Sequence, residues 1–114
     1  MLTIYHNPRC SKSRETLALI ESHDIEPSIV PYLDERLSKK TLKSLLSKLE
    51  MRPRELLRKN EEAYKALGLS DTQLGDDALI SAMIENPKLI ERPIVTDGKR
   101  AYLGRPPENI LPLL

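Results

Sequence analysis

The stretch Asn7-Pro8-Arg9-Cys10-Ser11-Lys12-Ser13-Arg14 is the most informative part of this sequence. A β-type segment, residues 2–5, leads into it, and a helix-type segment, residues 15–20, follows it. Cys10, the only cysteine of the chain, is therefore expected at the N-terminus of a helix. Helix N–H groups and the partial positive charge at that end favour the thiolate, as do the nearby cations Arg9, Lys12 and Arg14. The thiolate is the nucleophilic form, so we expect reactivity at this place.

Length and composition limit the classes of protein to be considered. A chain of 114 residues is near the common size of one domain, so we expect a single domain over residues 1–114. One cysteine cannot form an internal disulfide, which favours a reducing, cytoplasmic setting. No leader-like segment opens the chain, and no apolar run approaches the roughly 20 residues that span a bilayer. The 18 basic and 17 acidic residues nearly cancel, which gives no electrostatic case for nucleic-acid binding.

The opening of the chain predicts a βαβ unit. Residues 2–6 have the pattern of a buried strand, and residues 11–22 that of a helix with Leu17, Ala18 and Ile20 on its inner side. Residues 28–33 form a second strand-like run, in which Pro31 suggests an edge or the end of pairing. Such units build parallel sheets with a right-handed crossover.

The middle of the chain predicts a helical insert over about residues 35–90. Ser38 is a candidate N-cap for a helix with Leu42, Leu45, Leu46 and Leu49 on one face. Three more helices are expected: one from Pro53 to Arg58, one over residues 61–67 that Gly68 ends, and one capped by Asp76. The last of these would bury Leu79, Ile80, Met83 and Ile84 and end before Pro87.

The final part returns to β-structure. Residues 93–96 and 100–103 are strand-like, and the intervening Asp97-Gly98-Lys99 is a hairpin signal. Pro106 and Pro107 then begin an expected C-terminal helix with Ile110, Leu111 and Leu114 inward. The whole order predicts an α/β fold, a thioredoxin-like βαβ–ββα mixed sheet with a helical insertion between its halves. The Cys10 loop would then lie beyond the carboxyl end of the first strand, where ligands bind in open α/β sheets.

The chain resembles the glutaredoxin-dependent, glutathione-linked arsenate reductases in a series of motifs that cover almost its whole length. These motifs are Tyr5-His6-Asn7-Pro8-Arg9-Cys10-Ser11-Lys12-Ser13-Arg14, Pro31-Tyr32-Leu33, Arg54-Glu55-Leu56-Leu57-Arg58-Lys59-Asn60, Tyr64-Lys65-Ala66-Leu67-Gly68-Leu69, Asn86-Pro87, Leu89-Ile90-Glu91-Arg92-Pro93-Ile94-Val95 and Gly104-Arg105-Pro106. The resemblance implies a reaction in which the Cys10 thiolate attacks arsenate. Glutathione then adds as a co-substrate, glutaredoxin resolves the mixed species, and arsenite leaves. It implies no bound cofactor.

The resemblance also implies which residues serve this chemistry. Arg58, Arg92 and Arg105 match the three arginines that surround the oxyanion in the family, and His6 matches a histidine that assists the thiolate. Arginine offers a bidentate fork that suits such an anion. Pro93 matches a proline that is cis in thioredoxin-like folds. Further candidates for substrate binding line the start of the helix, which is itself an anion site; they are Ser11, Lys12, Ser13 and Arg14.

Other functions remain open at this stage. Cys10-Ser11-Lys12-Ser13 has the Cys-x-x-Ser form of monothiol, glutathione-dependent oxidoreductases, which would not need three arginines. The superfamily also contains non-enzymatic regulators that bind RNA polymerase, although these typically carry Cys-x-x-Cys. The phosphatase-like arsenate reductases need Cys-x5-Arg and further cysteines, and this chain has neither. One cysteine and two histidines give no zinc site, and no feature predicts an obligate oligomer, so we expect a monomer without metal.

Overall fold

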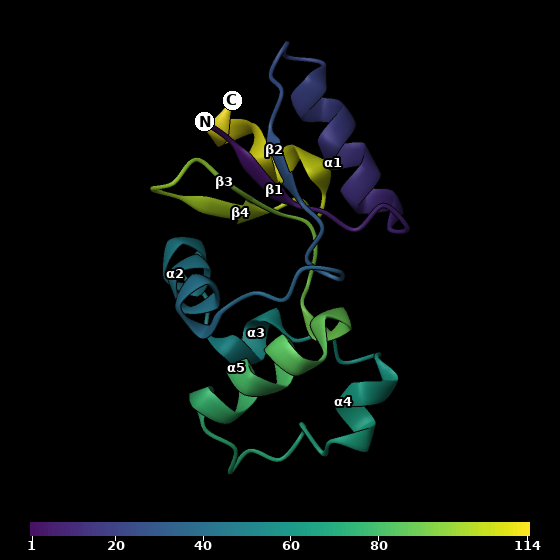
Figure 1. Cartoon of the computed structure of the whole chain (residues 1–114), viewed down its shortest axis with the longest axis vertical. Coiled ribbons are helices and arrows are strands. Elements are labelled where there is room, and N and C mark those ends of the chain that lie inside the picture. Colours follow the sequence, from purple (N-terminus) through teal and green to yellow (C-terminus); the bar gives the residue numbers. More distant parts are fainter. The chain divides into compact units, whose positions relative to one another are not determined.

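Four short strands form one mixed sheet in the order β2-β1-β3-β4 (Figure 1). The computed structural model describes residues 1–114. The strands are β1 (Thr3–Tyr5), β2 (Ser28–Val30), β3 (Ile94–Thr96) and β4 (Ala101–Leu103). β1 pairs in parallel with β2 and antiparallel with β3, and β3 pairs antiparallel with β4. The predicted βαβ unit and the predicted hairpin are thus both confirmed, and they meet where β1 lies beside β3.

The chain divides into two compact units. The sheet unit combines Met1–Glu35 with Arg92–Leu114, and the helical unit is Arg36–Glu91. The helical insert predicted over about residues 35–90 corresponds to the second of these. The two segments of the sheet unit are joined through the β1–β3 pairing, which brings residues some 90 positions apart in the sequence into register, Ile4 opposite Val95.

The core of the sheet unit lies between the sheet, helix α1 (Ser11–Glu21) and the 3-10 helix η2 (Pro107–Leu113). Ile4 and Val95 are fully buried cross-strand partners. Leu2, Ile20 and Ile110 complete the buried cluster. Burial of one such side chain contributes about 1.5–3 kcal/mol, so this aliphatic cluster supplies the stability that absent Phe and Trp would otherwise provide.

The inner face of α1 differs from the predicted one. Ser13, Thr16 and Ile20 are its buried residues, whereas Ala18 is exposed and Leu17 only partly buried. Two polar residues can face inward because their hydroxyl groups are hydrogen-bonded there, Ser13 to His6 and Thr16 to the carbonyl oxygen of Lys12. A search for apolar periodicity does not detect such a face.

The expected C-terminal helix is present as a 3-10 helix. Its period of three places Pro107, Ile110 and Leu113 toward the core, while Leu111 is 44% exposed, contrary to the prediction. Pro112 lies inside the helix and has no N–H to donate to an α-helical hydrogen bond. Leu114 packs against the core, as predicted.

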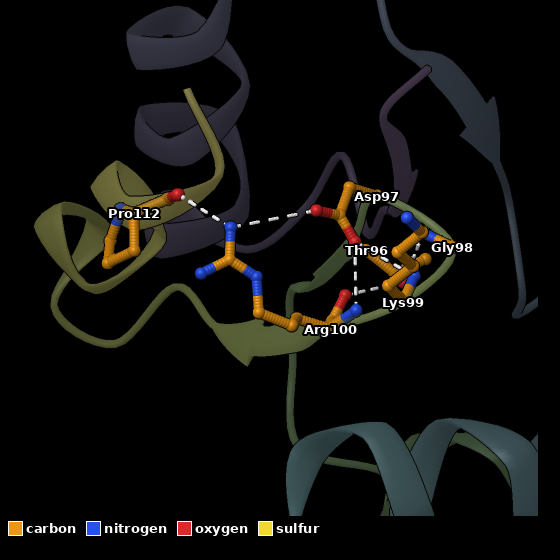
Figure 2. Close-up of polar contacts among 6 residues, drawn as sticks. All are labelled: Thr96, Asp97, Gly98, Lys99, Arg100 and Pro112. Atoms are coloured by element: carbon orange, nitrogen blue, oxygen red, sulfur yellow. Dashed lines mark hydrogen bonds and ion pairs between the residues drawn. The ribbon is translucent and has the colours of Figure 1, made fainter.

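The β3–β4 hairpin is closed by side chains and ties down this last helix (Figure 2). Asp97 Oδ1 accepts two backbone N–H groups of the turn, and Thr96 Oγ1 donates to the carbonyl oxygen of Arg100. Gly98 adopts a φ of 97°, which a side chain would strain. The guanidinium of Arg100 pairs with Asp97 and donates to the carbonyl oxygen of Pro112 at 3.0 Å. The predicted turn therefore also anchors the chain's end.

The helical unit contains α2 (Lys39–Leu49), α3 (Pro53–Leu56), α4 (Glu62–Ala66), α5 (Asp76–Glu85) and the 3-10 helix η1 (Pro87–Leu89). The predicted cap of α2 is confirmed, because Ser38 Oγ accepts the N–H of Thr41 at 3.1 Å. The predicted inner residues of α2 and α5 are largely buried, with Leu49 and Ile84 partly exposed. Asp76 is the first helical residue of α5, and the cap is Gly75 instead. No helix of the chain is long and apolar enough to cross a bilayer.

Candidate active site

Cys10 is the N-cap residue of α1, directly after the loop that leaves β1. Its backbone is extended, and its carbonyl oxygen accepts the N–H of Arg14 at 3.0 Å, the first hydrogen bond of the helix. The Cys10 N–H donates to the carbonyl oxygen of Asn7, which closes the loop on itself. The residue is 7% exposed, so the sulfur lies in a largely enclosed position at the positive end of a helix.

The surroundings of Cys10 favour its thiolate. Burial raises the pKa of the thiol, but the backbone N–H of Ser13, the charge and hydrogen bond of the Arg92 guanidinium, and the backbone N–H of Lys12 together lower it below its usual value. The N–H groups of Lys12 and Ser13 are among the donors that the first turn of a helix leaves without a partner in the helix. The predicted thiolate-stabilising position is therefore present, and its main cation is Arg92 rather than the neighbouring residues of the loop.

Arg92 combines burial with incomplete hydrogen bonding. Two of its nitrogens, Nε and Nη1, are buried without a hydrogen-bond partner. A buried donor left in this way costs about 1–3 kcal/mol, and native proteins rarely tolerate it without a functional reason. The Arg92–Pro93 peptide bond is cis, the conformation expected for this proline. Two unused donors on a guanidinium that also interacts with the sulfur of Cys10 are suited to an oxygen-rich anion.

Arg105 follows Gly104, at the end of β4, where the backbone lies close to Thr16 and Pro93. A Cβ on Gly104 would overlap the hydroxyl of Thr16 and lie within 2.9 Å of the Pro93 ring. Gly104 N–H donates to the carbonyl oxygen of Pro93 at 3.0 Å. The side chain of Arg105 is exposed, and its Nη1 donates to the carbonyl oxygen of Arg92 at 3.4 Å. Glycine thus permits the contact that brings the segments of Arg92 and Arg105 together; sequence reasoning did not single out Gly104 or Thr16.

His6, Asn7 and Ser13 form a buried network beneath the loop. Ser13 Oγ lies 2.6 Å from His6 Nδ1 and accepts the Asn7 N–H at 3.0 Å. Burial lowers the pKa of His6, and the positive charge of Arg14 lowers it further. His6, a candidate identified from the sequence, therefore lies next to the loop in surroundings that favour its neutral form.

The remaining loop candidates have partners of their own. Arg14 Nη1 donates to the carbonyl oxygen of Pro8 at 2.9 Å, and Lys12 pairs with Glu15 at 3.5 Å. Ser11 is exposed at the first position of the helix. Arg14 thus braces the loop and Lys12 pairs within α1, so the backbone N–H groups remain the most direct donors toward an anion at Cys10.

Arg58 belongs to the helical unit, and it lies just after α3 rather than within a helix as predicted. Leu57 forms a β-bridge with Ile90, and the Arg58 N–H donates to the carbonyl oxygen of Leu89 at 2.7 Å. Its guanidinium pairs with Glu61, and both side chains are about three-quarters buried, at 23% and 25% exposure. No group of three or more His, Cys, Asp or Glu side chains in the chain is placed to hold a metal ion.

A mixed four-stranded sheet with a cysteine at the first helix and a cis-proline before β3 defines a thioredoxin-like protein. The sequence model of the ArsC family matches residues 5–113, and the chain belongs to that family.

Three relatives show how far the similarity extends. The uncharacterized protein YfgD of Escherichia coli K12 is 52% identical over 112 residues, which cover 97% of this chain and 94% of the relative. An arsenate reductase of Haemophilus influenzae is 47% identical over 112 residues, 97% of each chain. A solved arsenate reductase of Vibrio cholerae superposes with a TM-score of 0.96 at 53% identity, covering 99% of this chain and 97% of that one. The family likeness therefore includes both the sheet and the helical insert.

Proposed function

We propose that this protein is an arsenate reductase that uses the Cys10 thiolate as its nucleophile and takes its further thiols from glutathione and glutaredoxin. The observation that carries the proposal is the pairing of a thiolate-favouring cysteine with the buried, unpartnered donors of Arg92. Relatives that are named arsenate reductases and match nearly the whole chain support it.

The proposed reaction begins with binding of the oxyanion at the first turn of α1. Helix N–H groups and Arg92 would hold its oxygens, with Arg105 and Arg58 supplying further positive charge on the strength of the family motifs. Forked guanidinium groups fit a tetrahedral oxyanion better than ammonium groups do. The Cys10 thiolate then attacks arsenic, an S–As bond forms, and one oxygen leaves as water.

The two electrons come from two thiols outside this chain, those of glutathione and glutaredoxin. Glutathione adds to the bound arsenic, and a second oxygen leaves as water. A glutaredoxin thiolate then attacks the glutathione sulfur and forms a mixed disulfide, and the electron pair of the broken S–As bond remains on arsenic, now As(III). Water finally cleaves the Cys10–arsenic bond and releases arsenite. A single cysteine makes an internal disulfide route impossible, which favours an external thiol in a reducing cytoplasm.

A coupled assay tests this proposal. NADPH consumption is followed with glutathione, glutathione reductase and glutaredoxin, with and without arsenate, and Cys10→Ser serves as the blank. We expect arsenate-dependent turnover that the variant abolishes, because a serine hydroxyl is a poor nucleophile at neutral pH. Turnover of a glutathione mixed disulfide without any arsenate response would instead place the protein among the monothiol oxidoreductases. Replacing glutaredoxin by thioredoxin in the same assay identifies the thiol donor.

A further inference from the structure

We propose that the hydroxyl of Ser13 is a positioning group, which fixes His6 as a neutral imidazole with its proton on Nε2 and aligns the Ser13 N–H with the sulfur of Cys10. This inference deepens the proposed function and rests on it only for the statement that the Cys10 thiolate reacts. The sequence gives Ser13 the place of a second cysteine in a Cys-x-x-Ser motif, whereas the structure gives its side chain a different task.

The argument starts from complete burial of the Ser13 side chain. Ser13 is 0% exposed and His6 is 8% exposed, so their polar atoms depend on partners inside the protein. The Ser13 oxygen has two such partners, the N–H of Asn7 at 3.0 Å and Nδ1 of His6 at 2.6 Å. The backbone N–H can only donate. Of these two partners only His6 Nδ1 can accept the hydroxyl hydrogen of Ser13, so we assign the donor role to the hydroxyl and the acceptor role to Nδ1.

This assignment determines both the tautomer and the charge of His6. A neutral imidazole that accepts at Nδ1 carries its proton on Nε2. A protonated His6 would have to donate from Nδ1 to the same serine oxygen, which already accepts from Asn7. The hydroxyl hydrogen would then lose its buried acceptor. The positive charge of Arg14 opposes protonation as well, and burial adds to this, so the pKa of His6 is lowered. His6 is consequently not the cation that stabilises the thiolate.

The same contacts position the main chain at the nucleophile. The backbone N–H of Ser13 is the foremost group that lowers the pKa of Cys10. The side chain of the same residue is hydrogen-bonded to His6, which follows β1, and to Asn7 in the loop. Without the hydroxyl, the first turn of α1 loses this anchor, and the N–H group can move away from the sulfur.

The experiment measures the imidazole and the thiol directly in the full-length protein. Nitrogen-15 NMR of the histidine side chains distinguishes the two tautomers, and His6 is told apart from His23 by a His23→Gln variant. We expect a pyridine-type signal for His6 Nδ1 and a pyrrole-type signal for Nε2. In Ser13→Ala we expect a changed tautomer ratio. We also expect alkylation of Cys10 at neutral pH to slow by about tenfold, the lower end of what loss of one hydrogen bond to a charged group gives.

Ser22, the C-cap residue of the same helix, offers a matched control. Ser22→Ala removes a serine hydroxyl at the exposed C-terminal end of α1, where it donates to the carbonyl oxygen of Leu19. This change should leave the His6 signals and the alkylation rate of Cys10 as they are. A wild-type His6 that is protonated on Nδ1, or an unchanged Cys10 rate in Ser13→Ala, overturns the proposal. If Ser13→Ala does not fold, the wild-type tautomer alone decides. None of these readouts uses arsenate, so failure of the proposed activity is recognised separately.

Discussion

We predict that Arg92→Met makes the protein more stable and inactive at the same time. In the native protein, Nε and Nη1 of Arg92 are buried without hydrogen-bond partners. Each buried donor left unsatisfied costs about 1–3 kcal/mol. Methionine is flexible and apolar, so it can occupy the space of the arginine stem without bringing such donors. The variant removes a cost that, under the proposed function, binding of an anion would offset in the wild-type protein.

The gain is partly offset by one lost interaction. The guanidinium of Arg92 acts on the Cys10 thiolate, and a hydrogen bond to a charged group contributes about 1.5–3 kcal/mol. We therefore expect the free energy of unfolding to rise by about 1–3 kcal/mol at a pH where Cys10 is ionised. The pKa of Cys10 is lowered in the folded state, so its thiolate contacts stabilise the fold at high pH and are lost as the pH falls through the folded pKa. The difference in the free energy of unfolding between Arg92→Met and the wild type should therefore increase as the pH falls.

Urea unfolding at two pH values measures this change. With a slope of about 1–3 kcal/mol per molar urea, the midpoint should rise by about 1 M. Arg105→Met removes the same charge from an exposed side chain and should alter stability by no more than about 0.5 kcal/mol. Arsenate at 100 times its Kd should stabilise the wild-type protein by about 2.7 kcal/mol, and Arg92→Met should not respond.

The reasoning fails if Arg92→Met unfolds at a lower urea concentration than the wild type at both pH values. That result would show that the guanidinium is satisfied in the folded state and contributes to the fold. Retained arsenate turnover in the variant would refute the anion role of Arg92 itself.

Two further substitutions test the supporting parts of the site. Gly104→Ala forces a methyl group against Thr16 and the Pro93 ring. We expect the free energy of unfolding, measured by heat or urea, to fall by about 1–3 kcal/mol and turnover to decrease. A stable variant with full activity would show that the contact is dispensable. Glu61→Gln removes the carboxylate that pairs with Arg58. If Arg58 binds the oxyanion, the freed guanidinium should lower KM for arsenate about two- to fivefold. This factor corresponds to an ion pair of about 0.5–1 kcal/mol. The decrease should vanish in an Arg58→Ala background, and a higher KM in Glu61→Gln would mean that Glu61 holds Arg58 in place instead.

Short-range sequence patterns predict most of the secondary structure. The cap at Ser38, the helix start at Pro53 and the hairpin turn at Asp97-Gly98 can be predicted because each depends on neighbours within a few residues. The differences from the prediction have two causes. The C-terminal 3-10 helix contains Pro112, which has no N–H for an α-helical hydrogen bond, whereas the inner face of α1 depends on His6 and Gly104 in other segments rather than on its own hydrophobic pattern.

The candidate site also has features that neighbouring residues predict and features that depend on distant segments. The sequence alone placed Cys10 at a helix N-terminus, and it also showed that no second thiol exists in the chain. It could not show that Arg92, 82 positions further along, would be the cation that acts on Cys10. Nor could it show that the Ser13 hydroxyl is buried against His6 instead of facing a substrate.

The residues alone specify the available chemistry: one thiol, a helix start that favours its ionisation, and arginines suited to an oxyanion. Which of these groups come together depends on the packing of distant segments. Pairing of β1 with β3 brings Arg92 to Cys10, and the missing side chain of Gly104 lets the Arg105 segment approach them. Helix caps and turns follow from short-range hydrogen bonds that a sequence displays, whereas burial and unsatisfied donors arise only when distant segments exclude water from the same space.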